Sequence, residues 1–304
     1  MFKRIATGLV YIGVLVGFFF LRNVDHRLFG ILIYAFSLIG TYEMVHAFCA
    51  PVEEKAEPLA HALRLCNSQK AAVYVYALIF TPAFYLVEEF APGQGYRAML
   101  VWSFSFAVAL LCLLVVDHRN TTLAGTGSAM LCGLYPPAIL STMLLTNEFE
   151  NASTLALLLI FVISPVADTF AFAVGSVLRG KKLCPNISPN KTISGAVGGV
   201  VFGTGASLLL YWLYTLTSDY VYTGIGSSWE GSVWVVMALI GLVTSLLTEF
   251  GDLVESVVKR RLGIKDMGKL LPGHGGILDR IDGTLFASLF VYIAFALFVV
   301  RVGL

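Results

Sequence analysis

The stretch 251–282 reads GDLVESVVKRRLGIKDMGKLLPGHGGILDRID and is unusually rich in charged residues for this chain. Its acids are Asp252, Glu255, Asp266, Asp279 and Asp282, and its bases are Lys259, Arg260, Arg261, Lys265, Lys269 and Arg280. Strongly apolar sequence flanks it on both sides. Because an unpaired charge is costly to bury, these side chains must contact water, ions or a charged substrate. The rest of the chain is predicted to be a membrane scaffold that holds this stretch.

The composition excludes an ordinary soluble domain. Hydrophobic residues make up 58% of the 304 residues and charged residues 13%, about half of the ~25% that is usual. The mean hydropathy is +0.82. Apolar runs of roughly 17 to 25 residues recur, which is the length of a membrane-crossing helix. We therefore predict an all-α polytopic membrane protein. The five cysteines lack metal-ligand spacing and are predicted to be packing residues.

About nine transmembrane helices are expected, because helices satisfy their backbone groups in lipid and the runs do not alternate as barrel strands would. The predicted spans are 5–21, 28–48, 71–87, 98–116, 122–145, 154–177, 196–216, 233–248 and 283–300. The first run exceeds the ~7–15 residues of a signal-peptide core and is interpreted as a retained span. Pro136 and Pro137 should kink or break the fifth span.

The lysines and arginines predict the orientation of these helices. With the N-terminus in the cytoplasm, the only bases on the opposite face are Arg22, Arg27, Arg97 and Arg301. This bias indicates a cytoplasmic N-terminus and an outside C-terminus. We expect two regions: 1–150 with about five spans, and 151–304 with about four spans plus the charged cytoplasmic loops. The loop 50–70 is expected to lie at the interface with a short helix.

Two polar features precede the charged stretch. Asp168 lies deep in the sixth predicted span, where a lone carboxylate usually faces a cavity or a partner; a structural ion pair or a protonated helix–helix hydrogen bond is the alternative. Lys191 and Thr192 precede a helix expected to start near Ser194, and its backbone N–H groups would suit a phosphate. The bases here could equally be topology determinants, and the glycines from Gly195 onward could mark close helix packing.

Spacing within 251–282 indicates a cation site. On a helix continuing past Glu249, four side chains share one face: Asp252, Glu255, Ser256 and Lys259. Asp279 and Asp282 also face together if the last helix begins nearby, so that with Asp252 they could hold a hard cation such as magnesium. His274 has no second His or Cys at ligand spacing, which argues against zinc. The alternative is a solvated charge run that binds anionic lipid headgroups.

A long motif in this stretch resembles the signature of the phosphatidate cytidylyltransferases, also called CDP-diacylglycerol synthases. It reads Ser256-x-x-Lys259-Arg260-x-x-x-x-Lys265-Asp266-x-Gly268-x-x-Leu271-Pro272-Gly273-His274-Gly275-Gly276-Ile277-x-Asp279-Arg280-Ile281-Asp282. The segments Gly251-Asp252-Leu253-x-Glu255-Ser256, Asp168-Thr169 and Ile187-Ser188-Pro189-x-Lys191-Thr192 are similar to the family's pattern too. Two positions depart from it: Ser194 replaces a common acid, and Glu249 stands where the family often has Gln.

The resemblance implies transfer of a cytidylyl group from CTP to phosphatidic acid, with release of pyrophosphate. It implies Mg²⁺ on Asp252, Asp279 and Asp282, with a second cation as a further expectation. The implied catalytic residues are Asp252, Lys259, Arg260, Lys265, His274, Asp279 and Asp282. The implied substrate-binding residues are Asp168, Lys191, Thr192, Ser256, Gly275, Gly276 and Arg280. The family also leads us to expect a homodimer in the inner membrane, with the site facing the cytoplasm and no nucleic-acid partner.

Two other functions remain open at this point. A CTP-dependent kinase of the polyprenol or phytol type would also be a polytopic membrane protein, but would transfer the γ-phosphoryl group to an alcohol. A transporter or non-enzymatic lipid-binding protein would fit the spans and Asp168 equally well. Polar residues gathered at one membrane face disfavour a transporter, whose site usually lies near the midplane.

Overall fold

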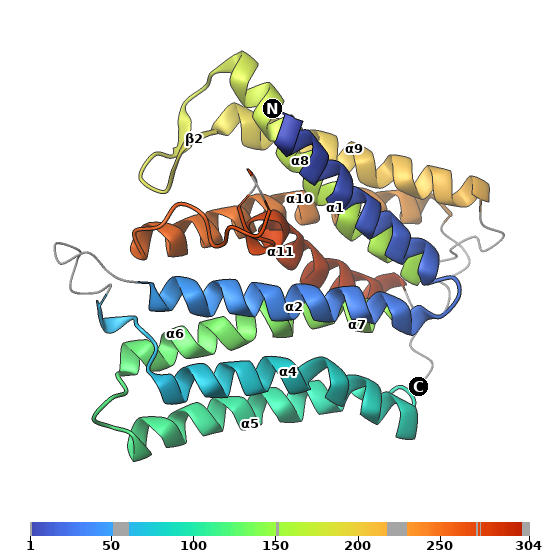
Figure 1. The fold of residues 1–304 in the computed structure, drawn as a ribbon. Helices are drawn as coiled ribbons and strands as arrows, with labels where there is room; N and C mark the ends of the chain where they lie inside the picture. The colour runs from blue at the N-terminus through green and yellow to red at the C-terminus, as the bar shows by residue number, and fades with distance from the viewer. Residues whose placement is uncertain are drawn as a thin grey trace. The chain divides into compact units, whose positions relative to one another are not determined.

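The computed structural model describes residues 2–50, 61–149, 152–217, 230–271, 273 and 275–299. Helices dominate, which confirms the all-α prediction (Figure 1). They are α1 (Phe2–Leu21), α2 (His26–Cys49), α4 (Asn67–Phe90), α5 (Gly95–Val116), α6 (Leu123–Gly133), η1 (Leu134–Ala138), α7 (Ile139–Asn147), α8 (Ser153–Leu178), α9 (Ile193–Thr217), α10 (Glu230–Arg261), α11 (Leu278–Ala294) and η2 (Phe295–Val299).

Within the described residues, eight helices are long and apolar enough to cross a membrane. They correspond to the second through ninth predicted spans, and α6, η1 and α7 together form the fifth, Leu123–Asn147. The first predicted span forms α1, of which Gly8–Leu21 counts as a shorter apolar helix. Most of the predicted interfacial loop lies outside the described residues. All five cysteines are free thiols.

The double proline interrupts regular α-helix in the fifth span, at the place where a kink or break is predicted, and the interruption takes the form of a π-helical turn. The π-helical turn η1 contains both Pro136 and Pro137, between the α-helical segments α6 and α7. A proline has no N–H to donate and its ring crowds the preceding turn, so regular α-helical bonding cannot continue through the pair.

A short antiparallel hairpin, which the sequence reading did not predict, connects α8 to α9. Its strands are β1 (Lys182–Cys184) and β2 (Ser188–Thr192), with Lys182 opposite Thr192. The helix α9 starts directly after β2, and the Thr192 hydroxyl accepts a hydrogen bond from Gly195 N at 3.1 Å. This side-chain bond to a free N–H of the first helical turn explains why α9 begins there.

The chain divides into two compact units. The first comprises Met1–Ser141 and Val258–Arg280, and the second comprises Thr142–Val257 and Ile281–Leu304. In the first unit, α2, α4, α5 and α6 pack against one another, with α1 beside α2 (Figure 1). The interleaved boundaries differ from a single division near residue 150. The end of α10 groups with the first unit, and most of α11 with the second.

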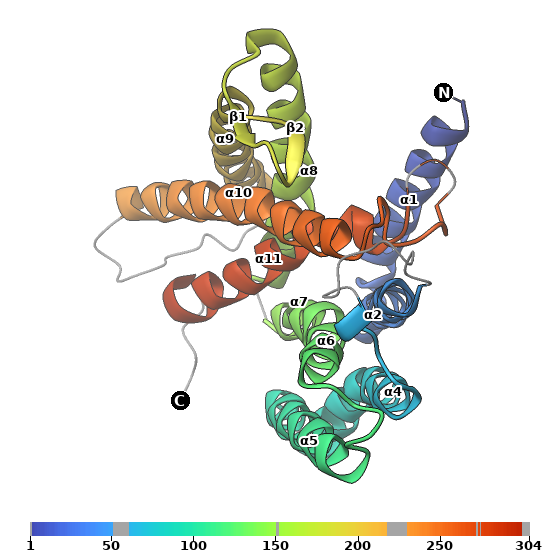
Figure 2. The ribbon, with the colours of Figure 1, turned by 90° about the vertical axis from the view of Figure 1, so that its left-hand side faces the viewer.

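In the second unit, α8 and α9 run side by side, with the hairpin at their connected ends (Figure 2). Glycines allow this close approach. A Cβ at Gly195 would lie 2.6 Å from Ala171 O, and one at Gly199 would lie 2.8 Å from Ala167 O. The α9 glycines at these positions therefore mark helix packing, as one sequence interpretation held.

Candidate functional site

Lys191 is the centre of a charged cluster in the second unit. Its Nζ lies 2.6 Å from Glu249 Oε2 and 2.6 Å from Asp252 Oδ2. Glu249 and Asp252 are three positions apart on α10, so both carboxylates emerge on one face of that helix. The strand β2 presents Lys191 to this face. The hairpin therefore brings Lys191 to two carboxylates that are far from it in sequence.

The charge of Lys191 is strongly stabilised. Burial alone would lower the pKa of the ammonium, but the neighbouring carboxylates Asp252 and Glu249 raise that pKa above its usual value. These carboxylates therefore favour the charged form of Lys191, which offsets part of the negative charge around it.

Two more carboxylates belong to the same cluster. Asp168 on α8 interacts electrostatically with Asp282, Glu249, Asp252 and Lys191. Asp168 has no close ion pair within the described residues, so the structural ion pair considered from the sequence is not formed there. We call Asp168, Glu249, Asp252 and Asp282 the acidic cluster. Lys191 thus lies among four acidic side chains.

One oxygen of this cluster is buried with no hydrogen-bond partner among the described residues. Glu249 is 6% exposed, and it is Oε1 that lacks such a partner, whereas Oε2 pairs with Lys191. A Cβ at Gly199 would lie 3.1 Å from Oε1, so this oxygen faces the glycine side of α9. Carboxylate oxygens are the donors that magnesium prefers. The donor set thus fits a hard cation, although no three such side chains in the described part of the chain already stand at ligand geometry.

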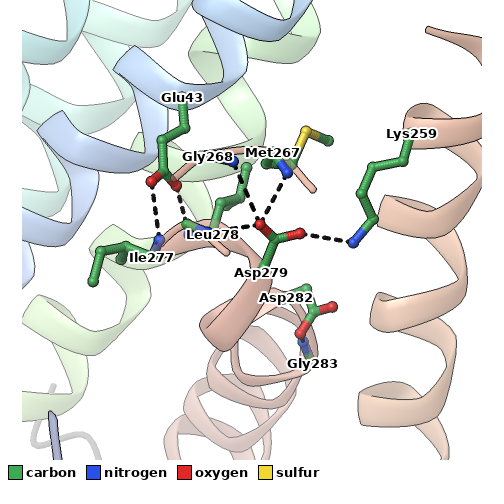
Figure 3. Close-up of polar contacts among 10 residues, drawn as sticks. Glu43, Lys259, Met267, Gly268, Ile277, Leu278, Asp279, Asp282 and Gly283 are labelled. Atoms are coloured by element: carbon green, nitrogen blue, oxygen red, sulfur yellow. Dashed lines mark hydrogen bonds and ion pairs between the residues drawn. The ribbon is translucent and has the colours of Figure 1, made fainter. Parts of the chain in front are cut away.

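Asp279 is the centre of a second cluster, in the first unit (Figure 3). Its Oδ1 atom lies 2.8 Å from Lys259 Nζ, and the two side chains are 4% and 12% exposed. Its Oδ2 atom accepts backbone N–H bonds from Met267 at 2.9 Å, Gly268 at 3.4 Å and Gly276 at 2.8 Å. Asp279 therefore ties the loop before α11 to the first turn of that helix.

Glu43 on α2 completes this second cluster and was missed by the sequence reading. It is 4% exposed, and its two oxygens accept Ile277 N at 3.0 Å and Leu278 N at 2.9 Å. Both N–H groups belong to the start of α11, where the helix dipole favours negative charge. The signal that could have revealed Glu43 is a lone carboxylate in an apolar span.

The glycines of the loop pack against these two carboxylates. A Cβ at Gly268 or Gly276 would overlap the Glu43 carboxylate, and one at Gly275 would lie 2.7 Å from Asp279 Oδ2. Gly275 also has a positive φ of 86°, which a residue with a side chain rarely adopts. These glycines therefore allow the loop to approach carboxylates of the same chain closely, and substrate binding by Gly275 and Gly276 stays a prediction.

The other predicted site residues divide by exposure. Arg260, Lys265 and Arg280 are exposed, whereas Ser256 and Thr192 are buried. Asp282 is 8% exposed and accepts a hydrogen bond from Gly283 N at 2.8 Å. The predicted role of His274 falls on a residue outside the described part of the chain. The continuous helix α10 confirms that Asp252, Glu255, Ser256 and Lys259 have helical spacing.

Comparison with known proteins identifies relatives along the whole chain. The model of the cytidylyltransferase family matches residues 2–298. The phosphatidate cytidylyltransferase of Bacillus subtilis (strain 168) is 32% identical over 303 residues, which cover 98% of each chain.

Two further phosphatidate cytidylyltransferases match over parts of their length. The protein of Brucella abortus biovar 1 (strain 9-941) is 38% identical over 159 residues, 52% of this chain and 53% of the relative. The protein of Rickettsia prowazekii (strain Madrid E) is 30% identical over 196 residues, 60% of this chain and 82% of the relative. Together with the full-length match, these findings show that the chain belongs to the cytidylyltransferase family.

Proposed function

We propose that this protein is an integral-membrane phosphatidate cytidylyltransferase, which converts phosphatidic acid and CTP into CDP-diacylglycerol and pyrophosphate. The similarity to the Bacillus subtilis enzyme over 98% of both chains carries the proposal. The family motif also supplies most of the residues of both charged clusters, with Glu43 and Glu249 as the additions. The reaction is a nucleotidyl transfer in which both reactants are anions.

The reaction forms one P–O bond and breaks another. A phosphate oxygen of phosphatidic acid attacks the α-phosphorus of CTP, and the bond to the β-phosphate breaks to release pyrophosphate. Positioning and charge neutralisation provide most of the acceleration in such transfers. Lys191 and Lys259 are already bound to carboxylates. The exposed Lys265 and Arg280 are therefore the cations best able to receive phosphates, and the phosphate contact of Arg260 stays a prediction.

Magnesium is proposed as the cofactor, with a second cation as a further expectation. Asp252 and Asp282 of the acidic cluster would hold it, and the unpaired Glu249 Oε1 supports this assignment. The bound cation would neutralise phosphate charge. It would thereby favour the approach of the lipid phosphate to CTP and the departure of pyrophosphate. Asp279 belongs to the first unit, where Oδ1 has Lys259 as its partner, and its share in a metal site stays a prediction.

The proposed location is the inner membrane, with the catalytic residues facing the cytoplasm. The lysine and arginine distribution supports this orientation. The lipid substrate would then enter from the bilayer, while CTP and pyrophosphate exchange with the cytoplasm. A homodimer is a prediction from the family alone.

The test is an assay in detergent with radiolabelled CTP and phosphatidic acid, with magnesium present or chelated. We expect magnesium-dependent label in the lipid together with released pyrophosphate, and loss of both in Asp282→Asn. Release of CDP without a cytidylyl lipid would instead establish a kinase. A well-folded protein that incorporates no label would overturn the enzymatic proposal in favour of a lipid-binding protein or transporter.

A further inference from the structure

The carboxylate of Glu43 is buried among backbone donors. It is 4% exposed, and its partners in the described structure are the N–H groups of Ile277 and Leu278, one on each oxygen (Figure 3). Each carboxylate oxygen thus accepts one backbone N–H. A glutamine could not replace this arrangement, because its amide has one acceptor oxygen and would turn N–H groups toward a backbone donor.

The loop before α11 is shaped to fit around this carboxylate. Gly268 and Gly276 lie near the two ends of the loop 267–276. A side chain at either position would overlap Glu43. Leu271 N donates to Gly275 O at 2.8 Å, a bond within this loop. Glu43 therefore contacts this loop at two glycines and binds the N–H groups at the start of α11.

Asp279 receives its position from the same loop. Gly276 N donates to Asp279 Oδ2, and the next two N–H groups along the chain donate to Glu43. A shift of the Glu43 carboxylate would therefore move the first turn of α11, Asp279 and the Lys259 contact together. No substrate-facing role of Glu43 is needed for this effect.

We propose that Glu43 is a positioning residue for cytidylyl transfer, acting through the loop 267–276 on Asp279 and Lys259. The inference rests on the proposed function, since it assigns Glu43 to that reaction. In Glu43→Gln, we expect kcat to fall by about 10- to 100-fold, the scale on which a displacement of about 1 Å reduces catalysis. The KM for CTP should stay within about threefold, because the exposed bases remain.

A matched control separates positioning from general packing. Thr41 lies on the same helix, is fully buried, and donates its hydroxyl hydrogen bond to Ser37 O within that helix. Thr41→Val should therefore keep the wild-type kcat. A comparable fall of kcat in Thr41→Val would overturn the proposal, as would a wild-type kcat in Glu43→Gln.

Two readouts do not depend on the reaction. Amide hydrogen exchange at 276–278 should accelerate in Glu43→Gln, and unchanged exchange would contradict an effect through the loop. Gly268→Ala should lower the thermal midpoint less in a Glu43→Ala background than in wild type, because the overlapping carboxylate is gone. Additive effects would count against the contact.

These readouts also separate the two proposals. If the wild-type protein made no CDP-diacylglycerol, the proposed function would be overturned. Slower loop exchange in the wild type than in Glu43→Gln would still establish that Glu43 positions the loop.

Discussion

The Lys259 ammonium lies 2.8 Å from Asp279 Oδ1 and so joins the last turn of α10 to the first turn of α11. Both side chains are largely buried, and Asp279 also accepts three backbone N–H groups. The pair therefore belongs to a network that fixes the intervening loop. Removing Asp279 should consequently have a different effect on stability from removing Lys259.

Asp279→Asn should destabilise the protein more than Lys259→Met. The Asp279 carboxylate accepts hydrogen bonds from four donors, one of them Lys259. Loss of the lysine still leaves this carboxylate with its three backbone donors. We expect the free energy of unfolding to fall by about 3–5 kcal/mol for Asp279→Asn, at the level reported for broken buried ion pairs, and by less for Lys259→Met.

Equilibrium unfolding in detergent checks this order. Lys269→Met is the control, because Lys269 is exposed and its substitution should change stability by less than about 0.5 kcal/mol. If Lys259→Met were the more damaging variant, the backbone bonds of Asp279 would contribute little.

The sequence predicted the parts of the fold that depend on local pattern. Long apolar runs predicted the transmembrane helices, the double proline predicted an interruption of the fifth span, and the charge spacing predicted the helix that carries Asp252 and Lys259. Each of these follows from residues that are close in sequence, where helix period and proline chemistry apply directly.

Long-range partners could not be predicted in the same way. Glu43 meets N–H groups of Ile277 and Leu278, and every residue but proline has such a donor, so nothing in the sequence singles out these two. Likewise, Lys191 and Glu249 are brought together by the hairpin β1–β2, whose strands are too short to show a clear alternating pattern.

Lys191→Met should abolish most of the activity. The substitution leaves Glu249 and Asp252 without their cation, with Asp168 and Asp282 in electrostatic range. The repulsion would displace the acidic cluster, and kcat should fall by at least about 10²-fold. Lys182→Met is the control, because Lys182 is exposed on the same hairpin. Equal activity in the two variants would show that the Lys191 contacts do not matter for catalysis.

Glu249→Gln should weaken the response to magnesium while preserving the fold. The amide oxygen still accepts a hydrogen bond from Lys191, but one negative charge is lost beside the unpaired Oε1 position. Because affinity for hard cations depends on ligand charge, the magnesium concentration for half-maximal activity should rise several-fold. A magnesium titration of the two proteins measures this, and identical midpoints would exclude Glu249 from the surroundings of the cation.

Gly251→Ala should separate two helices that carry acidic residues. Gly251 lies where α10 meets α11 in the second unit: a Cβ there would lie 2.7 Å from Asp282 O and 3.2 Å from Gly283 Cα. These are backbone atoms, which cannot rotate away, so overpacking should lower the free energy of unfolding by about 1–3 kcal/mol. The displacement would also move Asp252 away from Asp282 and reduce kcat.

The control for this variant is another helical glycine. A Cβ at Gly205 would meet no atom within 4 Å, so Gly205→Ala should leave activity unchanged and stability equal or higher by up to about 1 kcal/mol, because alanine favours helix. The thermal midpoint and the kcat of both variants, measured in the same detergent, test this prediction. Wild-type values for Gly251→Ala would mean that α10 and α11 tolerate a wider separation, and that the spacing of Asp252 and Asp282 does not depend on this glycine.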